Sequence, residues 1–521
     1  MGGSTERGRL GRIVGVAASL LLLAAACGGG EDQDGAAATI TAPPTVVGSD
    51  ARSTPSSGPA TTPIDEDVET MDDLEARWAE RRAAVVASLS ADSYGIDEKS
   101  VLVGPSQFSV DLGKCPAGWS DVTGLTDTTI TIGLILPQSG DQAAYNDLWL
   151  GMKVYFDWVN AHGGIGGRTL RLVTRDDGYD PATTPAALAD LLAADNPFYV
   201  TTVGTPGSLA VYDQLNKGCI PQPFAATSHP ALADPVAHPW STGLQMSYPT
   251  EAVLWGNWLK QNLGGKGPVS VGALVIDNDF GQIYANAFQQ WADANPDVVS
   301  GVTVVKHAPA VTSVSKEMAK LAEGQPQVLL AMTNGPACTS AMQEAATTGL
   351  DATALVRFLP SVCTGADAYM NPAGPAADGV YAVGPGVVSL NDPAHAEDTF
   401  VRFAVEELDA ADLDPTRELL GVGFGQYGWA HVEILRIAAA LPGGLTRSNV
   451  LLALRGADLV HPLVDEGVRF TTSGAADAYF VEGAAYNRYD AKVKGWYPQG
   501  TAIDLNGSSP ACEWVRDVCQ R

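Results

Sequence analysis

Two stretches of the chain decide the fold: ITIGLILPQSG (130–140) and NAHGGIGGRTLRLVTRDDGYDP (160–181). Residues 130–136 form an apolar run that ends at Pro137, as expected for a parallel strand buried on both faces. Apolar residues then recur at helical spacing over 144–159, Gly163-Gly164 stops that helix, and a second apolar run begins at Leu170. The resulting βαβ unit places its Ser139-Gly140 turn at a carboxyl end of the sheet, where open α/β folds bind ligands.

Further motifs follow this unit in a recognisable order. The unit itself reads strand, P-x-S-G, helix, N-x-x-G-G-I-x-G-R, strand, D-D-x-x-D-P, and it is followed by GTPGS (204–208), PQPFAAT (221–227), VGALVIDNDFGQIYANAF (271–288) and DGVYAV (378–383). Over roughly 130–498 this order resembles the branched-chain amino-acid type of periplasmic binding proteins, which have the type I fold. These proteins are the solute receptors of ABC importers.

Alternating strand and helix patterns predict an α/β fold with two doubly wound parallel-sheet lobes. The expected strands include 199–203, 219–224, 269–276, 328–332 and 356–359. The resemblance implies a hinge that the chain crosses three times, near 245–249, 384–388 and 463–471. We therefore assign 128–247 plus 387–467 to lobe 1 and 248–386 plus 468–500 to lobe 2, with 501–521 as a C-terminal tail.

The N-terminal segment is typical of an exported lipoprotein. Arg7, Arg9 and Arg12 precede an apolar run over 13–26, which predicts a signal peptide over 1–26. The small residues before Cys27 resemble a lipobox, although Ala24 stands where Leu is more usual. An ordinary cleaved signal with an incidental cysteine is the alternative. A lipid on Cys27 would anchor the protein to the membrane on its extracytoplasmic side.

Between this segment and the lobes the composition changes twice. Residues 27–66 are small and polar, which predicts a flexible tether. Residues 67–127 form an extension with one amphipathic helix over 71–89, which either packs on the body or binds a partner. The net charge of −28 disfavours nucleic acid as a partner, because nucleic acid needs clustered Lys and Arg. We expect a monomer.

Six cysteines remain besides Cys27, and an even number on an exported chain suggests disulfides. Cys338 and Cys363 follow consecutive strands and are the favoured pair. Cys512 and Cys519 are close enough to close a small loop, but either of them linked to Cys115 is an alternative. The absence of zinc spacings disfavours a metal site, and no cofactor is expected.

The resemblance places the ligand among residues of both lobes. Ser208 in GTPGS caps a helix expected from Leu209, and with the amides around Gly207 it offers an anion site. Ala225 and Thr227 stand at positions that hold the amino acid in the resembled family, and Tyr145 stands where an aromatic residue forms a wall of the pocket. The candidate ligand-binding residues are Ser139, Tyr145, Gly207, Ser208, Ala225, Thr227, Phe280, Asn334 and Ser361.

The loop after Phe358 departs from the family pattern. Amino-acid receptors commonly have an acidic residue there, whereas this chain reads Leu-Pro-Ser-Val-Cys over 359–363. A desolvated ammonium needs a charged or well-formed acceptor. The sequence therefore disfavours an α-amino acid and favours a ligand without an ammonium, unless Asp277 or Asp279 supplies the acceptor.

No motif indicates catalysis. GFGQYG (423–428) fits G-x-G-x-x-G but follows no strand, so the start of a helix explains it better than a dinucleotide site. Asp176 and Asp177 are neighbours on a strand and point to opposite faces, which disfavours a carboxylate dyad. We predict a receptor that is not an enzyme and that delivers an amino acid, amide or carboxylate to an ABC permease. The alternative is an extracellular sensor of the same fold that signals to a membrane partner.

Overall fold

The computed structural model describes residues 68–91, 94–384, 388–464 and 468–506, together with two short strands near the C-terminus, β17 (Glu513–Val515) and β18 (Val518–Gln520). The expected signal peptide, Cys27, the tether and Cys512 lie outside the described residues, and so does the side chain of Cys519. Among the described residues, no helix combines the length and the apolar character needed to cross a membrane.

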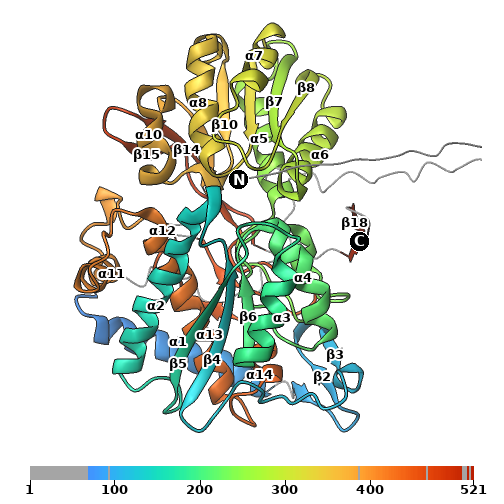
Figure 1. Ribbon diagram of the computed structural model, residues 1–521, viewed down its shortest axis with the longest axis vertical. Coiled ribbons are helices and arrows are strands. Elements are labelled where there is room, and N and C mark those ends of the chain that lie inside the picture. Colours follow the sequence, from blue (N-terminus) through green and yellow to red (C-terminus); the bar gives the residue numbers. More distant parts are fainter. Residues whose placement is uncertain are drawn as a thin grey trace, which may run out of the picture. The chain divides into compact units, whose positions relative to one another are not determined.

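The first sheet has three parallel strands in the order β5-β4-β6 (Figure 1). Its central strand β4 is almost wholly buried, as its apolar run predicts. The strands are β4 (Thr129–Leu136), β5 (Thr169–Asp176) and β6 (Tyr199–Thr202). The surrounding helices are α2 (Asn146–Ala161), α3 (Thr184–Asp195), α4 (Thr205–Lys217), α11 (Thr399–Ala410), α12 (Glu418–Gly421), α13 (Ala430–Ala440) and α14 (Arg447–Leu454).

The expected strand over 219–224 is wrong. Pro221 and Pro223 lack the N–H groups that a ladder needs, and Cys219 and Phe224 have φ of 50°. The segment makes an isolated parallel bridge from Gln222 to Ser241 instead of joining the sheet as a strand. It still runs beside β6, because the N–H of Val200 donates to the carbonyl of Pro221 at 3.0 Å.

The second sheet has eight strands, seven of them in the order β15-β14-β11-β10-β9-β7-β8. The strands from β7 to β11 pair in parallel, whereas β14, β15 and β16 pair antiparallel at one edge. The strands are β7 (Val269–Ile276), β8 (Val299–His307), β9 (Val328–Met332), β10 (Val356–Leu359), β11 (Tyr381–Gly384), β14 (Gly483–Asp490), β15 (Gly495–Pro498) and β16 (Ile503–Asp504). The helices are α5 (Tyr248–Leu263), α6 (Asp279–Ala294), α7 (Ser315–Glu323), α8 (Pro336–Thr348), α9 (Leu350–Thr353) and α10 (Asn371–Ala373).

The last crossing between the lobes lies later than the expected 463–471. Phe470 and Val481 are buried in the core around the first sheet, whereas Ala484 and Tyr486 belong to the core of the second. Val481 also forms a parallel bridge with Gln245, next to the first crossing. The chain therefore changes lobe near Glu482, after the short pair β12 (Asp458–Leu459) and β13 (Phe470–Thr471).

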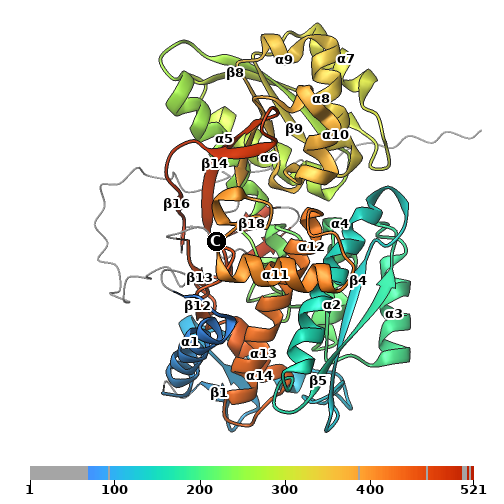
Figure 2. The same cartoon turned by 90° about the vertical axis from the view of Figure 1, so that its left-hand side faces the viewer.

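The N-terminal extension has more structure than the one expected helix. After α1 (Met71–Ala91) it forms a three-stranded antiparallel sheet from β1 (Gly95–Ile96), β2 (Val101–Val103) and β3 (Ser109–Asp111). Figure 2 shows α1 beside α13. Trp78 meets Trp429 edge-on with ring centroids 5.6 Å apart, and Arg82 donates at 2.8 Å to Glu433, whose side chain is fully buried. The helix thus packs on the body of the protein.

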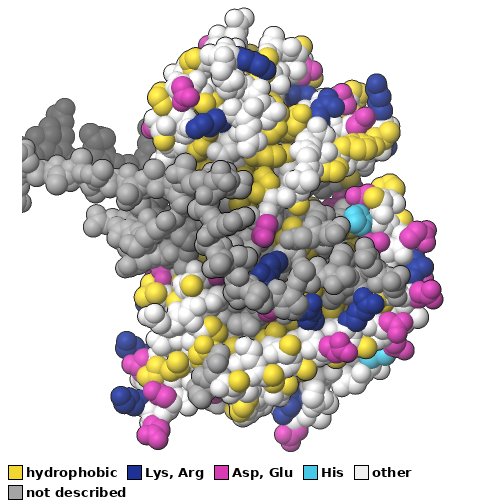
Figure 3. All heavy atoms as spheres, turned by 180° about the vertical axis from the view of Figure 1, so that it is seen from behind, with side chains coloured by type: hydrophobic (Ala, Val, Ile, Leu, Met, Phe, Trp, Pro, Cys, Tyr) yellow, Lys and Arg dark blue, Asp and Glu magenta, His cyan; other side chains and the backbone are white. Residues whose placement is uncertain are grey.

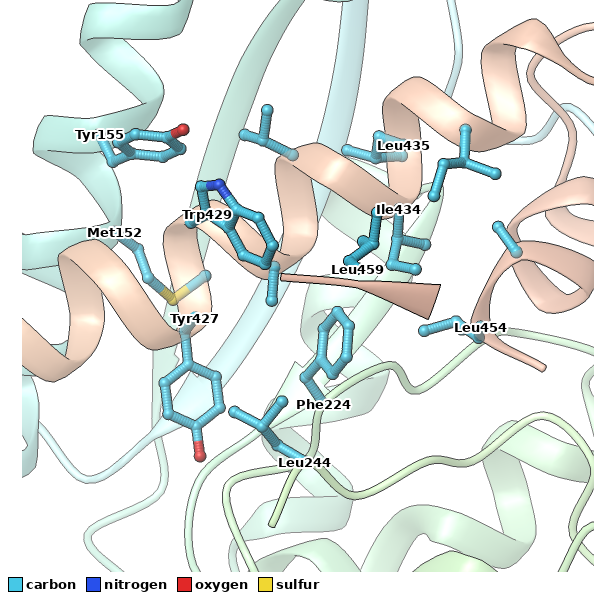
Figure 4. Packing of buried hydrophobic residues seen from close by; sticks show 14 of the residues in the cluster. Met152, Tyr155, Phe224, Leu244, Tyr427, Trp429, Ile434, Leu435, Leu454 and Leu459 are labelled. Carbon is cyan, nitrogen blue, oxygen red and sulfur yellow. The ribbon is translucent and has the colours of Figure 1, made fainter. Parts of the chain in front are cut away.

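Glycine accounts for the close contact between α2 and the helical segment η9 (Val422–Trp429), which contains GFGQYG. A Cβ on Gly423 would lie 2.1 Å from the carbonyl oxygen of Leu148, and one on Gly151 would lie 2.1 Å from that of Leu420. The motif therefore serves helix packing, and it follows α12 instead of a strand. Figure 4 shows the core beside this contact, where Met152 and Tyr155 of α2 lie close to Tyr427 and Trp429.

On the face shown in Figure 3, the visible acidic and basic side chains are interspersed. Neither charge gathers into a large patch among the side chains that are visible there. The distribution of charge on this face therefore does not indicate a binding surface.

Candidate ligand-binding site

A cavity of about 170 Å³ lies where strands of both sheets end. Residues that follow β4, β5 and β6 line it from the first lobe, and residues that follow β7, β9 and β10 line it from the second. In this chain order they are Tyr145, Tyr179, Thr205, Phe280, Asn334 and Ser361. Carboxyl ends of parallel strands are where open α/β sheets bind ligands, so the topology itself positions this site.

The beginning of α4 forms one wall of the cavity. The Oγ1 atoms of Thr205 and Thr227 lie 2.7 Å apart, and the phenol of Tyr248 shares hydrogen bonds with both threonines. Gly204 caps the helix with φ of +91°, and a Cβ there would lie 2.3 Å from the ring of Tyr179. Glycine is thus required both by the backbone and by the close approach of that ring.

Five tyrosines line the cavity: Tyr145, Tyr179, Tyr248, Tyr369 and Tyr427. The rings of Tyr145 and Tyr179 stack with centroids 6.3 Å apart, and Phe280 meets Tyr248 edge-on at 4.9 Å. Burial raises the pKa of every one of these phenols, that of Tyr369 to about 12. The phenols are therefore neutral at physiological pH and act as hydrogen-bonding groups on aromatic walls.

Asn334 joins the two lobes across the cavity. Its Nδ2 donates to the phenol oxygen of Tyr179 at 2.8 Å, and its Oδ1 accepts from Nε2 of Gln142 at 3.2 Å. A Cβ on Gly335, where φ is +60°, would lie 2.3 Å from Nε2 of Gln142. The side chain of Gln142 thus lies directly against the backbone at the start of α8.

The loop after β10 is held from behind by a carboxylate. Glu251 on α5 accepts hydrogen bonds from the backbone N–H of Ser361 at 2.8 Å and from its hydroxyl at 3.0 Å. The Tyr284 phenol donates to the same carboxylate at 2.5 Å. Burial raises the pKa of Glu251 to about 7, although these hydrogen bonds oppose the shift. Glu251 does not itself line the cavity.

A second carboxylate, that of Glu418 on α12, does line the cavity. Its Oε2 accepts from the hydroxyl of Ser389 at 2.8 Å and from Nδ2 of Asn391 at 3.3 Å. Its backbone N–H donates at 3.1 Å to Asp367, which follows β10 in the other lobe. Burial raises the pKa of Glu418, and the neighbouring charges of Asp367 and Asp392 add to this shift.

Residues 129–483 match the family described as periplasmic binding protein. The chain belongs to this family. The chain is therefore a periplasmic binding protein. No curated protein sequence matches the chain.

Solved structures of other periplasmic binding proteins show the same fold. They include a fatty acid ABC transporter substrate-binding protein from Thermomonospora curvata (TM-score 0.63, 19% identity, 75% of this chain and 96% of that one). A branched chain amino acid ABC transporter structure from Thermus thermophilus with bound valine has a TM-score of 0.62 at 17% identity, covering 73% and 97%. A solute-binding protein from R. palustris in complex with benzoate has a TM-score of 0.59 at 18% identity, covering 74% and 99%.

Most of the residues that the sequence proposed for this binding protein meet at the cavity. Those that line it are Tyr145, Ala225, Thr227, Phe280, Asn334 and Ser361. Ser139, Gly207 and Ser208 do not line it. Ser139 is exposed and bonded to Asp176, and a Cβ on Gly207 would face the carboxylate of Asp177 at 2.7 Å.

Ser208 is misplaced because α4 begins at Thr205, four residues before the expected start. This start puts Ser208 inside the first lobe, fully buried, with its Oγ 2.8 Å from Oγ1 of Thr202. Thr205 takes the expected place at the cavity. The signal was available, because Pro206 is favoured in the first turn of a helix.

Other lining residues were missed for different reasons. Tyr179 lies in the quoted D-D-x-x-D-P motif, directly after a strand, and its position at the sheet edge could have been inferred. Glu418 gave no such signal, because it follows no strand of either sheet. The loop after Phe358 supplies no carboxylate, as its sequence shows, but Glu418 brings one to the cavity from another segment. Neither of the suggested substitutes, Asp277 and Asp279, lines the cavity, and Asp277 is bonded to Lys306 at 2.7 Å.

Two disulfides are present among the described residues. Cys338 pairs with Cys363, the favoured pair, and ties α8 to the loop that contains Ser361. Cys115 pairs with Cys219, so the alternative that linked Cys115 to Cys512 or Cys519 is wrong. The indole N–H of Trp119 donates to the carbonyl of Cys219 at 2.8 Å. This bond also holds the segment that contains Cys115 next to Cys219.

Proposed function

We propose that this periplasmic binding protein is a lipid-anchored receptor that closes on one small molecule and delivers it to an ABC permease. The observation that carries the proposal is the cavity at the carboxyl ends of strands from two sheets. Its volume of about 170 Å³ resembles that of cavities of roughly 150 Å³ that hold benzene-sized molecules. A ligand of that size would touch both lobes at once.

Contacts between the lobes support closure as the mechanism. Asn334 bonds to Tyr179 on one side of the cavity, and the carboxylate of Asp367 accepts from the N–H of Glu418 on another. A ligand that touches both lobes adds binding energy only in the closed state and so shifts the population toward it. A permease that recognises the closed state would then receive loaded protein selectively.

The ligand is not selected by the fold. The similar structures named above include one described as a fatty acid binding protein, one with valine and one with benzoate. An amino acid, an amide or a carboxylate therefore all remain compatible with the architecture, and the lining residues have to decide among them.

Binding is tested by a thermal-shift screen of the purified protein against amino acids, amides, amines and short carboxylates. A ligand at 100 times its dissociation constant adds about 2.7 kcal/mol to the free energy of unfolding. Val362→Trp, which fills the cavity, should abolish the shift, whereas Val493→Trp at an exposed position should preserve it. A ligand that stabilises both variants equally binds elsewhere and contradicts the proposed site.

A further inference from the structure

The described side chains that line the cavity include one acidic group and no basic group. Among these described residues there is no lysine, arginine or histidine, and the only carboxylate is that of Glu418. A ligand carboxylate would find only hydroxyls, amides and the beginning of α4 as partners. It would also lose hydration next to a negatively charged side chain, which disfavours an anion.

Aromatic rings enclose the same space. Five tyrosines and Phe280 line the cavity. The rings lie close together: those of Tyr145 and Tyr179 stack with centroids 6.3 Å apart, and that of Phe280 meets that of Tyr248 at 4.9 Å. Aromatic faces attract cations through the ring quadrupole, and cages of such rings bind ammonium groups. The walls of the cavity thus favour positive charge.

The carboxylate of Glu418 is held in place with one oxygen available. Both hydrogen bonds that it receives from described residues, from Ser389 and Asn391, go to Oε2. Its Oε1 has no partner among the described residues. Since Glu418 lines the cavity, this unbonded oxygen leaves its carboxylate able to accept an N–H from a ligand.

We propose that the ligand carries an ammonium group, which binds to the carboxylate of Glu418 among the tyrosine rings and requires no carboxylate on the ligand. This inference rests on the proposed binding function and specifies its substrate class as a small organic cation. It reverses the expectation drawn from the loop after Phe358, because the counter-charge comes from α12 of the first lobe.

The test compares ligands that share an apolar group, isopentyl or 2-phenylethyl, and differ in the charged or polar group attached to it. One set is isopentylamine, isopentanol, 4-methylpentanoate and leucine, and a second set is 2-phenylethylamine, 2-phenylethanol and 3-phenylpropanoate. Calorimetry on the full chain should show that the amine of at least one set binds at least tenfold more tightly than its alcohol and its carboxylate. Preferential binding of a carboxylate, or binding of leucine but of neither amine, overturns the inference and leaves the proposed receptor function standing.

Variants separate a role in charge recognition from a structural role. Glu418→Gln keeps a side-chain oxygen for Ser389 but removes the charge, so it should lower the affinity for the amine at least tenfold and leave that for the alcohol unchanged. Glu406→Gln, an exposed position on α11, is the matched control and should change neither. An equal loss for amine and alcohol would show that Glu418 only supports the wall and would overturn the inference. If no compound of these two sets and none of the thermal-shift screen binds, the proposed receptor function fails as well.

Discussion

Asn334 and Tyr179 are joined by a hydrogen bond of 2.8 Å, although Asn334 follows β9 of the second sheet and Tyr179 follows β5 of the first. Both residues line the cavity. The bond therefore exists only while the lobes are together, and it stabilises the closed arrangement. Because this bond lowers the free energy of the closed state, less of the ligand's binding free energy is needed to shift the population from open to closed.

We expect Asn334→Ala and Tyr179→Phe each to weaken ligand binding, and the double variant to weaken it less than the sum of the two effects. The coupling energy should be about 0.5–1.5 kcal/mol, the usual net value of one hydrogen bond. Calorimetry on the four proteins of this double-mutant cycle measures it, with the best ligand of the screen. Additive effects would mean that the two side chains act independently and that their bond plays no part in closure.

Thr227 and Ser208 should respond differently to loss of their hydroxyls, although the sequence predicted that both bind the ligand. Thr227→Val removes a cavity hydroxyl that is bonded to Thr205 and should weaken binding by about 1–1.5 kcal/mol, roughly tenfold. Ser208→Ala should leave affinity unchanged and lower the free energy of unfolding by about 1–3 kcal/mol, because it leaves the buried Thr202 without this partner. Calorimetry and urea denaturation separate the two outcomes.

The sequence was informative where local rules determine structure. The apolar runs of β4, β7 and β9 and the helical stripe of α2 were recognisable because burial on both faces or on one stripe leaves a strong period. The edge where strands end then follows from topology, which explains why Tyr145, Thr227, Phe280, Asn334 and Ser361 were placed correctly at the cavity.

The predictions that failed concern the rotation of a helix about its axis or contacts between residues that are far apart in the sequence. The helical phase that turns Ser208 inward and Thr205 outward depends on one boundary, and boundaries are the least certain part of a sequence pattern. Glu418 reaches the cavity from a segment far along the chain, and Glu251 supports Ser361 from 110 residues away. Such pairings result from tertiary packing, and no spacing in the sequence encodes them.

The anchor at Cys27 is tested independently of the cavity. Cys27→Ser removes the thiol that would be lipidated, so the protein should move from the membrane fraction to the soluble fraction, as followed by immunoblotting of fractionated cells. Ligand affinity should not change, because the described residues that line the cavity begin only at Tyr145, far along the chain from Cys27. Wild-type protein that is already in the soluble fraction would favour the alternative of an ordinary cleaved signal with an incidental cysteine.

Glu251 links the support of the ligand loop to pH. Its pKa rises from 4.5 to about 7 in the folded protein because burial disfavours the charged carboxylate. The folded state therefore binds more protons than the unfolded state between these two values. The contribution of the Glu251 carboxyl group to the free energy of unfolding is fully present below about pH 4.5 and is lost as the pH rises through about 7.

Replacement of Glu251 by Gln should remove this dependence, because an amide does not titrate. The difference in free energy of unfolding between the wild type and Glu251→Gln should change by a few kcal/mol between about pH 5 and about pH 8, at about 1.4 kcal/mol for each pKa unit, with the wild type losing more stability as the pH rises. Urea denaturation at both pH values measures it, and Glu406→Gln serves as the control for a general effect of losing one carboxylate. A difference that stays constant with pH would mean that Glu251 titrates alike in both states. The hydrogen bonds from Ser361 and Tyr284 would then offset its burial completely.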